Sequence, residues 1–214
     1  MLHHKYIAVE GPIGVGKTSL AEILSKKLNA RLVLEGAVEN PFIGEFYKDI
    51  KKHAFQTQMF FLLSRYRQQQ EMVQSDLFQQ GVVSDYIFAK DRLFANLTLD
   101  DNELKLYEQL HSILTGRVLK PDFVIYLQAS TDVLLKRISM RGRKFESHIT
   151  GDYLAELNQA YNYYFFHYQE TPLMVINTSE IDFVHRDADL DDLLVHMSKV
   201  SKGTTYYQPV SVKK

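Results

Sequence analysis

Short apolar runs alternate with stretches of helical periodicity along most of the 214-residue chain. The runs have the length of buried strands, and the stretches between them space apolar side chains as on one face of a helix. Strands that alternate with helices predict an α/β fold, with a parallel sheet that carries helices on both faces. The five predicted strands are Lys5–Val9, Arg31–Leu34, Val82–Ser84, Phe123–Leu127 and Leu173–Ile176.

The helical stretches lie between these strands and after the last one. The predicted helices are Thr18–Leu28, Ile43–Lys52, His53–Gln79, Asp101–Leu114, a segment that starts at Thr131, Asp152–Tyr168 and Asp189–Val200. The final segment, Ser201–Lys214, shows no periodicity. We therefore expect one domain over residues 1–200, long enough to bury a large core, and a C-terminal tail over residues 201–214.

A glycine-rich loop, Gly11-Pro-Ile-Gly-Val-Gly-Lys17-Thr18, follows the first predicted strand and opens the first predicted helix. It matches the phosphate-loop pattern in its proper context. Glycines leave backbone N–H groups free to surround a triphosphate, and the helix N-terminus favours anions. Lys17 is expected to reach the outer phosphates, and the Thr18 hydroxyl is suited to ligate Mg²⁺. The predicted nucleotide-binding residues here are Gly11, Gly14, Val15, Gly16, Lys17, Thr18 and Ser19.

Two acidic residues follow the next two strands, Glu35 after the second and Asp85 after the third. Because parallel strands end at the same edge of a sheet, both carboxylates are expected beside the phosphate loop. Glu35 is therefore the candidate general base for a hydroxyl acceptor, and Asp85 a candidate ligand or positioner of Mg²⁺. The simpler alternatives are a solvated loop glutamate and an aspartate that caps the next helix.

A basic segment with Arg137, Arg141, Arg143 and Lys144 around Gly142 lies at the end of the predicted helix from Thr131. Such a segment can close over a triphosphate and stabilise the charge of the transferred group. A run of charges is otherwise a solvated surface. Beside a phosphate loop we expect a lid over about residues 137–147.

Composition limits the function more than it defines it. The formal net charge is −1, which argues against a broad nucleic-acid-binding face. The chain has no cysteine, which suits a reducing cytoplasm. No segment approaches the ~18 consecutive apolar residues of a membrane span, so no membrane association is expected.

The predicted helix His53–Gln79 carries Gln58 and Arg65 seven positions apart, on one face. Amide and guanidinium groups beside aromatic residues suit the edge of a planar base. The same helix is equally compatible with a core helix that turns these side chains to solvent.

In order and spacing, the phosphate loop, Glu35 with Glu39-Asn40-Pro41, and the Gln58–Arg65 pair resemble the deoxynucleoside kinase family over Lys5–Val200. The resemblance implies the P-loop kinase fold, and it implies substrate contacts from Glu35, Tyr47, Gln58, Arg65, Asp85, Asp91 and Glu146. It implies catalytic roles for Glu35, Lys17, Arg137, Arg141 and Arg143. It also implies that Asp182 and Phe183 lie against the adenine of ATP.

The activity that this resemblance implies is the ATP- and Mg²⁺-dependent phosphorylation of the 5′-hydroxyl of a 2′-deoxynucleoside. Deoxyadenosine or deoxycytidine is the favoured substrate, and a homodimer the favoured assembly. The alternatives are a nucleoside-monophosphate kinase similar to thymidylate kinase, and a non-catalytic nucleotide-binding protein. One departure is that Asp85-Tyr86-Ile87 replaces the family's acidic-Arg-Ser triplet. Lys90 or Arg92 is then expected to supply the missing charge.

Overall fold

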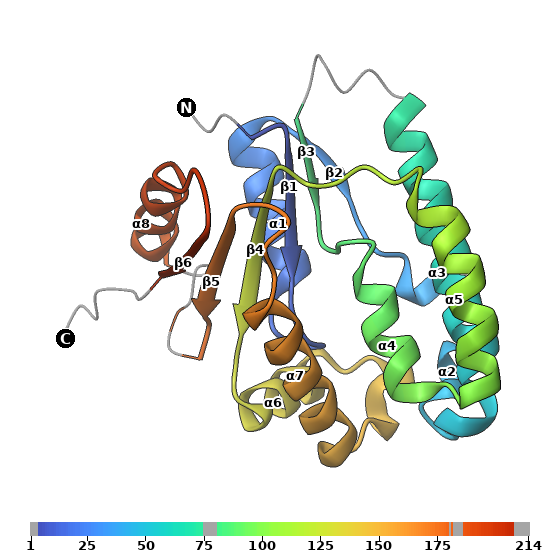
Figure 1. The fold of residues 1–214 in the computed structure, drawn as a ribbon. Helices are drawn as coiled ribbons and strands as arrows, with labels where there is room; N and C mark the ends of the chain where they lie inside the picture. The colour runs from blue at the N-terminus through green and yellow to red at the C-terminus, as the bar shows by residue number, and fades with distance from the viewer. Residues whose placement is uncertain (1–3, 75–80, 180, 182–185, 208–214) are drawn as a thin grey trace.

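The computed structural model describes the whole chain except residues 1–3, 75–80, 180, 182–185 and 208–214. The described residues form one parallel sheet with the strand order β2-β3-β1-β4-β5-β6, flanked by helices (Figure 1). The strands are β1 (Tyr6–Glu10), β2 (Arg31–Val33), β3 (Val82–Ser84), β4 (Phe123–Gln128), β5 (Leu173–Asn177) and β6 (Thr204–Tyr207). The predicted α/β class is confirmed.

The α-helices connect these strands in chain order. They are α1 (Lys17–Leu28), α2 (Ile43–Phe46), α3 (Ile50–Gln74), α4 (Lys90–Thr98), α5 (Asp101–Thr115), α6 (Thr131–Arg141), α7 (Gly151–Phe166) and α8 (Asp187–Met197). Short 3₁₀ turns η1 (Ala37–Glu39) and η2 (Lys144–His148) lie in the loops. In Figure 1, α3, α4 and α5 lie together on one side of the molecule, whereas α8 lies at the far edge beside β6. No helix in the described part of the chain is long and apolar enough to cross a membrane.

The predicted count of five strands is wrong, because the described residues contain a sixth. Thr204–Tyr207 pairs in parallel with β5, inside the segment expected to be a featureless tail. Threonine and tyrosine are favourable strand residues, but this strand is short and mostly exposed at the sheet edge. It therefore lacks the apolar run by which the buried strands were found.

The long helix α3 begins earlier than the sequence predicted. The expected break between Lys52 and His53 is absent, and the chain instead leaves α2 at Tyr47 and enters α3 at Ile50. The Asp49 carboxylate accepts a hydrogen bond from the Lys52 backbone N–H at 3.2 Å. This side-chain cap fixes the helix start. The predicted end at Gln79 lies outside the described residues.

The order of the central strands positions the candidate site. β1 lies between β3 and β4, and β2 lies on the other side of β3. All of them run in the same direction, so the carboxyl ends of β1, β2 and β3 lie along one edge of the sheet, where the chain leaves each strand. The phosphate loop, Glu35 and Asp85 therefore meet at that edge, as the sequence predicted.

Candidate active site

The loop between β1 and α1 has a backbone that only glycine adopts easily. Gly14 and Gly16 have φ angles of 84° and 107°, in the left-handed region. A Cβ atom on Gly14 would lie 2.8 Å from Cγ1 of Ile138, so α6 approaches the loop closely. Lys17 Nζ donates to the backbone oxygens of Gly11 at 2.7 Å and Pro12 at 3.1 Å. Burial, followed by the positive charge of Lys90, lowers the pKa of Lys17 to about 7.

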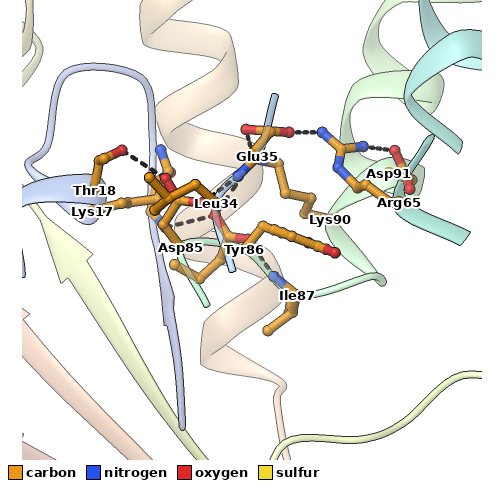
Figure 2. A network of polar contacts seen from close by, with 12 residues as sticks. Lys17, Thr18, Leu34, Glu35, Arg65, Asp85, Tyr86, Ile87, Lys90 and Asp91 are labelled. Carbon is orange, nitrogen blue, oxygen red and sulfur yellow. Dashed lines mark hydrogen bonds and ion pairs between the residues drawn. The ribbon is translucent and has the colours of Figure 1, made fainter. Parts of the chain in front are cut away.

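Asp85 joins the phosphate loop to the segment after β2. The Thr18 hydroxyl donates to Asp85 Oδ2 at 2.6 Å, and the Glu35 backbone N–H donates to Asp85 Oδ1 at 2.7 Å (Figure 2). Three residues that the sequence placed on one rim are thus brought into direct contact. Asp85 is buried at this junction. It does not cap the next helix, because α4 begins at Lys90 with Ala89 as its N-cap.

The Glu35 side chain is held by two cations. One carboxylate oxygen pairs with Arg65 Nη2, and the other accepts from Lys90 Nζ at 2.8 Å (Figure 2). The other side of the Arg65 guanidinium pairs with Asp91, and both of these side chains are buried. Burial lowers the pKa of Arg65, but the guanidinium stays charged. A solvated loop glutamate is therefore not what the structure shows.

The segment that carries Glu35 is fastened to α3. Asn40, which is buried, donates through Nδ2 to the Thr57 backbone oxygen at 3.2 Å and accepts from the Phe42 N–H at 3.0 Å. Gln68 on the same helix donates to the Leu34 backbone oxygen at 3.0 Å. These contacts hold the loop at both ends, so that Glu35 faces α3.

A cavity opens between the phosphate loop, Glu35 and α3. Gln58 and Arg65 both line it, as one helical face predicts, and Gln58 Nε2 donates to Thr98 Oγ1 at 3.2 Å. The Phe61 ring also lines the cavity, with its centroid 4.8 Å from the Arg65 guanidinium carbon. Asp91 does not line this cavity; it lies behind Arg65.

Tyr47 lies at the opposite wall of the cavity, where its ring stacks on Phe145 of η2 with centroids 6.4 Å apart. Burial raises the pKa of Tyr47 well above its usual value, so its phenol stays protonated. It is thus a hydrogen-bond donor at neutral pH.

The predicted lid arginines have different partners. Arg141 and Arg143 line the cavity beside Glu146, whose carboxylate accepts from Arg141 Nη2 at 2.5 Å and lies 3.7 Å from Arg143 Nη1. Arg137 does not line the cavity. It donates to the Val15 backbone oxygen at 3.3 Å and to the Thr178 backbone oxygen at 2.7 Å, so it supports the loop from outside.

The sequence analysis missed Glu10, the last residue of β1. Glu10 is fully buried and accepts from Gly11 N at 2.8 Å, Ile87 N at 2.9 Å and the Tyr161 hydroxyl at 3.1 Å. It therefore ties the phosphate loop to the segment after β3 and to α7. The sequence does contain a signal for it: Glu10 directly follows the apolar run Tyr6–Val9 of the first strand.

The unexpected Tyr86 is fully buried and does not line the cavity. Of the two alternative cations, Arg92 is exposed and pairs with Glu108 at 2.9 Å, whereas Lys90 reaches Glu35. Three further predicted residues lie away from these contacts or outside the described part of the chain. Ser19 lies in the first turn of α1, and Asp182 and Phe183 lie outside the described residues.

Comparisons with known proteins identify the family of this chain. The sequence model of the family described as deoxynucleoside kinase matches residues 7–202. The chain is 37% identical to a deoxyguanosine kinase of Bacillus subtilis over 91% of this chain and 97% of that one. It is 34% identical to a deoxyadenosine kinase of Lactobacillus acidophilus over 83% and 87% of the two chains. A structure of M. mycoides deoxyadenosine kinase with bound dATP superposes with a TM-score of 0.79, at 26% identity, over 92% of this chain and all of that one.

The family match favours kinase activity on a nucleoside over a thymidylate kinase-like activity or a non-catalytic role. It covers the phosphate loop, the Glu35 segment and the basic lid in one continuous stretch. The chain is an enzyme that phosphorylates deoxynucleosides with ATP, and it belongs to the deoxynucleoside kinase family.

Proposed function

We propose that the substrate is a purine 2′-deoxynucleoside, phosphorylated on its 5′-hydroxyl with Glu35 as the general base. One observation carries this proposal: the Glu35 carboxylate lies on the cavity, between the Thr18–Asp85 contact at the phosphate loop and Arg65 on α3. A deoxynucleoside whose sugar lies between the phosphate loop and Arg65 would direct its 5′-hydroxyl at the phosphate loop and its base at α3.

The transfer uses groups of this chain in distinct roles. The 5′-oxygen bonds to the γ-phosphorus as the bond to the bridging oxygen of ATP breaks, and Glu35 takes the hydroxyl proton. Lys17 and the loop N–H groups hold the phosphates, while Arg141 and Arg143 offset charge on the equatorial oxygens. Tyr47 and Glu146 bind the 3′-hydroxyl. Arg137 is a positioning residue for the loop backbone rather than a phosphate contact.

The residues at the loop fit Mg²⁺. This hard cation prefers oxygen ligands and is usually held by one or two protein groups together with substrate phosphates. The Thr18 hydroxyl and the Asp85 carboxylate, in contact at 2.6 Å, provide such a pair beside the phosphate loop. The described residues contain no cluster of three acidic, His or Cys ligands, which suits an ion shared with phosphates. When bound, the ion offsets charge on the β- and γ-oxygens.

The base preference follows from the cavity wall. An arginine fork suits O6 and N7 of guanine, and a glutamine amide suits N6 and N7 of adenine. Arg65 and Gln58 both line the cavity, and Asp91 pairs with the far side of Arg65. We therefore favour deoxyguanosine and deoxyadenosine. The sequence-based preference included deoxyadenosine but also deoxycytidine.

A coupled ADP-release assay with deoxyguanosine, deoxyadenosine, deoxycytidine and thymidine tests this preference. The expected result is a kcat/KM for both purines at least about tenfold above that for the pyrimidines, which corresponds to ~1.4 kcal/mol of discrimination. Thymidylate serves as the acceptor that a monophosphate kinase would use. A pyrimidine that leads the series would contradict the base assignment, and a preference for thymidylate would contradict the hydroxyl acceptor.

We further propose one domain that extends beyond the predicted boundary at residue 200 to include β6, with a lid at about residues 137–147, working as a homodimer in the cytoplasm. Support for the dimer comes from α7, where Tyr163 and Phe166 are 71% and 78% exposed. Neighbouring aromatic side chains exposed on one helix are typical of a contact surface.

Light scattering after size exclusion is expected to give twice the chain mass for the wild type and the monomer mass for Phe166→Glu. A buried glutamate without a partner weakens a contact by several kcal/mol, on the order expected for an uncompensated charge. Val195→Glu changes an exposed residue of α8 and serves as the matched control, which should remain dimeric. A wild-type monomer would contradict the proposed assembly.

A further inference from the structure

Lys90 is a buried lysine in the wall of the cavity. It is the first residue of α4, and it is only 2% exposed. Its ammonium lies 2.8 Å from Glu35 Oε2 and 4.0 Å from Glu10 Oε1. The Phe94 ring lies below it, with its centroid 5.6 Å from Nζ. Lys90 thus reaches from α4 to the proposed base through a confined space.

Burial and a nearby carboxylate act in opposite directions on the charge of this ammonium. Burial lowers the pKa of Lys90 to about 8, with Glu10 acting in the opposite direction. Glu10 cannot turn away, because its two oxygens are fixed by Gly11 N, Ile87 N and the Tyr161 hydroxyl. A buried charge is stable only when it is paired and hydrogen-bonded. Lys90 therefore has a fixed electrostatic environment on one side and Glu35 on the other.

Glu35 has two cationic partners, Arg65 and Lys90, which differ in the carboxylates that remain available to them if the ion pair with Glu35 breaks. Arg65 has a second carboxylate partner in Asp91, so it remains paired when it turns toward a base. Without Glu35, the nearest described carboxylate to the Lys90 ammonium would be the more distant Glu10, with a weaker attraction from Asp85. The oxygen of Glu35 on the Arg65 side is thus the one that becomes free for the 5′-hydroxyl.

We infer that Lys90 is the positioning residue for Glu35: its ammonium holds one carboxylate oxygen in place while the other receives the proton of the 5′-hydroxyl. The inference rests on the proposed role of Glu35 as the base. It assigns to α4 a charge that is absent after β3, where Tyr86 is buried away from the cavity. The other candidate, Arg92, points to solvent and to Glu108.

The test compares Lys90→Met, which keeps the length of the side chain without its charge, with Lys90→Arg. A displaced catalytic group commonly costs about 10²-fold in rate. We expect kcat of Lys90→Met to fall about 10²-fold while the Kd of the deoxynucleoside, measured by calorimetry without ATP, changes less than about threefold. Lys90→Arg restores the charge and is expected to recover most of kcat. Arg92→Met, the matched control, should keep the wild-type kcat.

A thermal unfolding midpoint for each variant separates positioning from stability. A structural role would lower the midpoint and weaken nucleoside binding together with kcat, and that pattern would overturn the inference. So would an unchanged kcat in Lys90→Met. Lys90→Gln, which keeps a polar donor without charge, serves if Met disturbs folding, and the same fall in kcat is expected. A wild type that phosphorylates no deoxynucleoside would instead contradict the proposed function itself.

Discussion

Replacement of Glu35 by Gln is expected to lower kcat by about 10²- to 10⁴-fold, the range of general-base catalysis. The amide keeps the shape of the side chain but does not accept the hydroxyl proton. Arg65 retains Asp91, and Lys90 retains Glu10 at 4.0 Å, so the neighbouring cations are not left without a carboxylate. Binding of the deoxynucleoside should therefore change little.

The measurement is the single-turnover rate of nucleotide formation, with the Kd from calorimetry measured in parallel. Glu39→Gln in the same loop is the matched control, because Glu39 is exposed and should leave the rate unchanged. A Glu35→Gln rate close to the wild type would remove Glu35 from the role of base. An equal fall in rate and affinity would place it in substrate binding alone.

The second large effect is expected at Arg141. Arginines that offset the charge of a transferred phosphoryl group contribute on the order of 10³-fold or more to kcat. Arg141 lines the cavity, and its partner Glu146 belongs to the same lid segment, so phosphates can compete for it. Arg141→Met should lower kcat about 10³-fold, with a much smaller relative effect on stability, because Arg143 stays 3.7 Å from the Glu146 carboxylate.

Arg137 provides the contrast, because it lies on the same helix four positions earlier. Its hydrogen bonds include those to the backbone oxygens of Val15 and Thr178 and to the Thr178 hydroxyl. Arg137→Met is thus expected to lower the unfolding midpoint and to weaken ATP binding through the loop. Measuring kcat and the thermal unfolding midpoint of Arg137→Met and Arg141→Met distinguishes the two roles. If the two variants behave alike, the separation of the arginines into a lid group and a loop support is wrong.

The parts of the site that depend on strand order could be predicted from the sequence. Once β1, β2 and β3 are parallel, the phosphate loop, Glu35 and Asp85 must meet at one sheet edge. The spacing of Gln58 and Arg65 likewise places both on one face of α3, whatever the exact helix start.

The partners of Glu35 could not be predicted in this way. Its pairing with Arg65 and Lys90 depends on how α3 and α4 pack together over the sheet, which no local pattern encodes. The two roles on α6 were hidden for a similar reason. Gly142, with a φ of 65°, ends α6 directly after Arg141. Arg141 and Arg143, on either side of this glycine, line the cavity, whereas Arg137 lies one turn earlier in the helix and does not. Glu10 was missed because an acidic residue at the end of a strand is usually expected at the surface.

In the proposed complex the cavity directs the 5′-hydroxyl of the substrate at Glu35 and a purine base at α3. A crystal structure with deoxyguanosine and a non-hydrolysable ATP analogue tests it most directly. We expect the 5′-oxygen within about 3.2 Å of a Glu35 carboxylate oxygen, with Lys90 still on the other oxygen and the base edge on Gln58 and Arg65. A 5′-oxygen directed away from Glu35, or a base bound to another element, would contradict it.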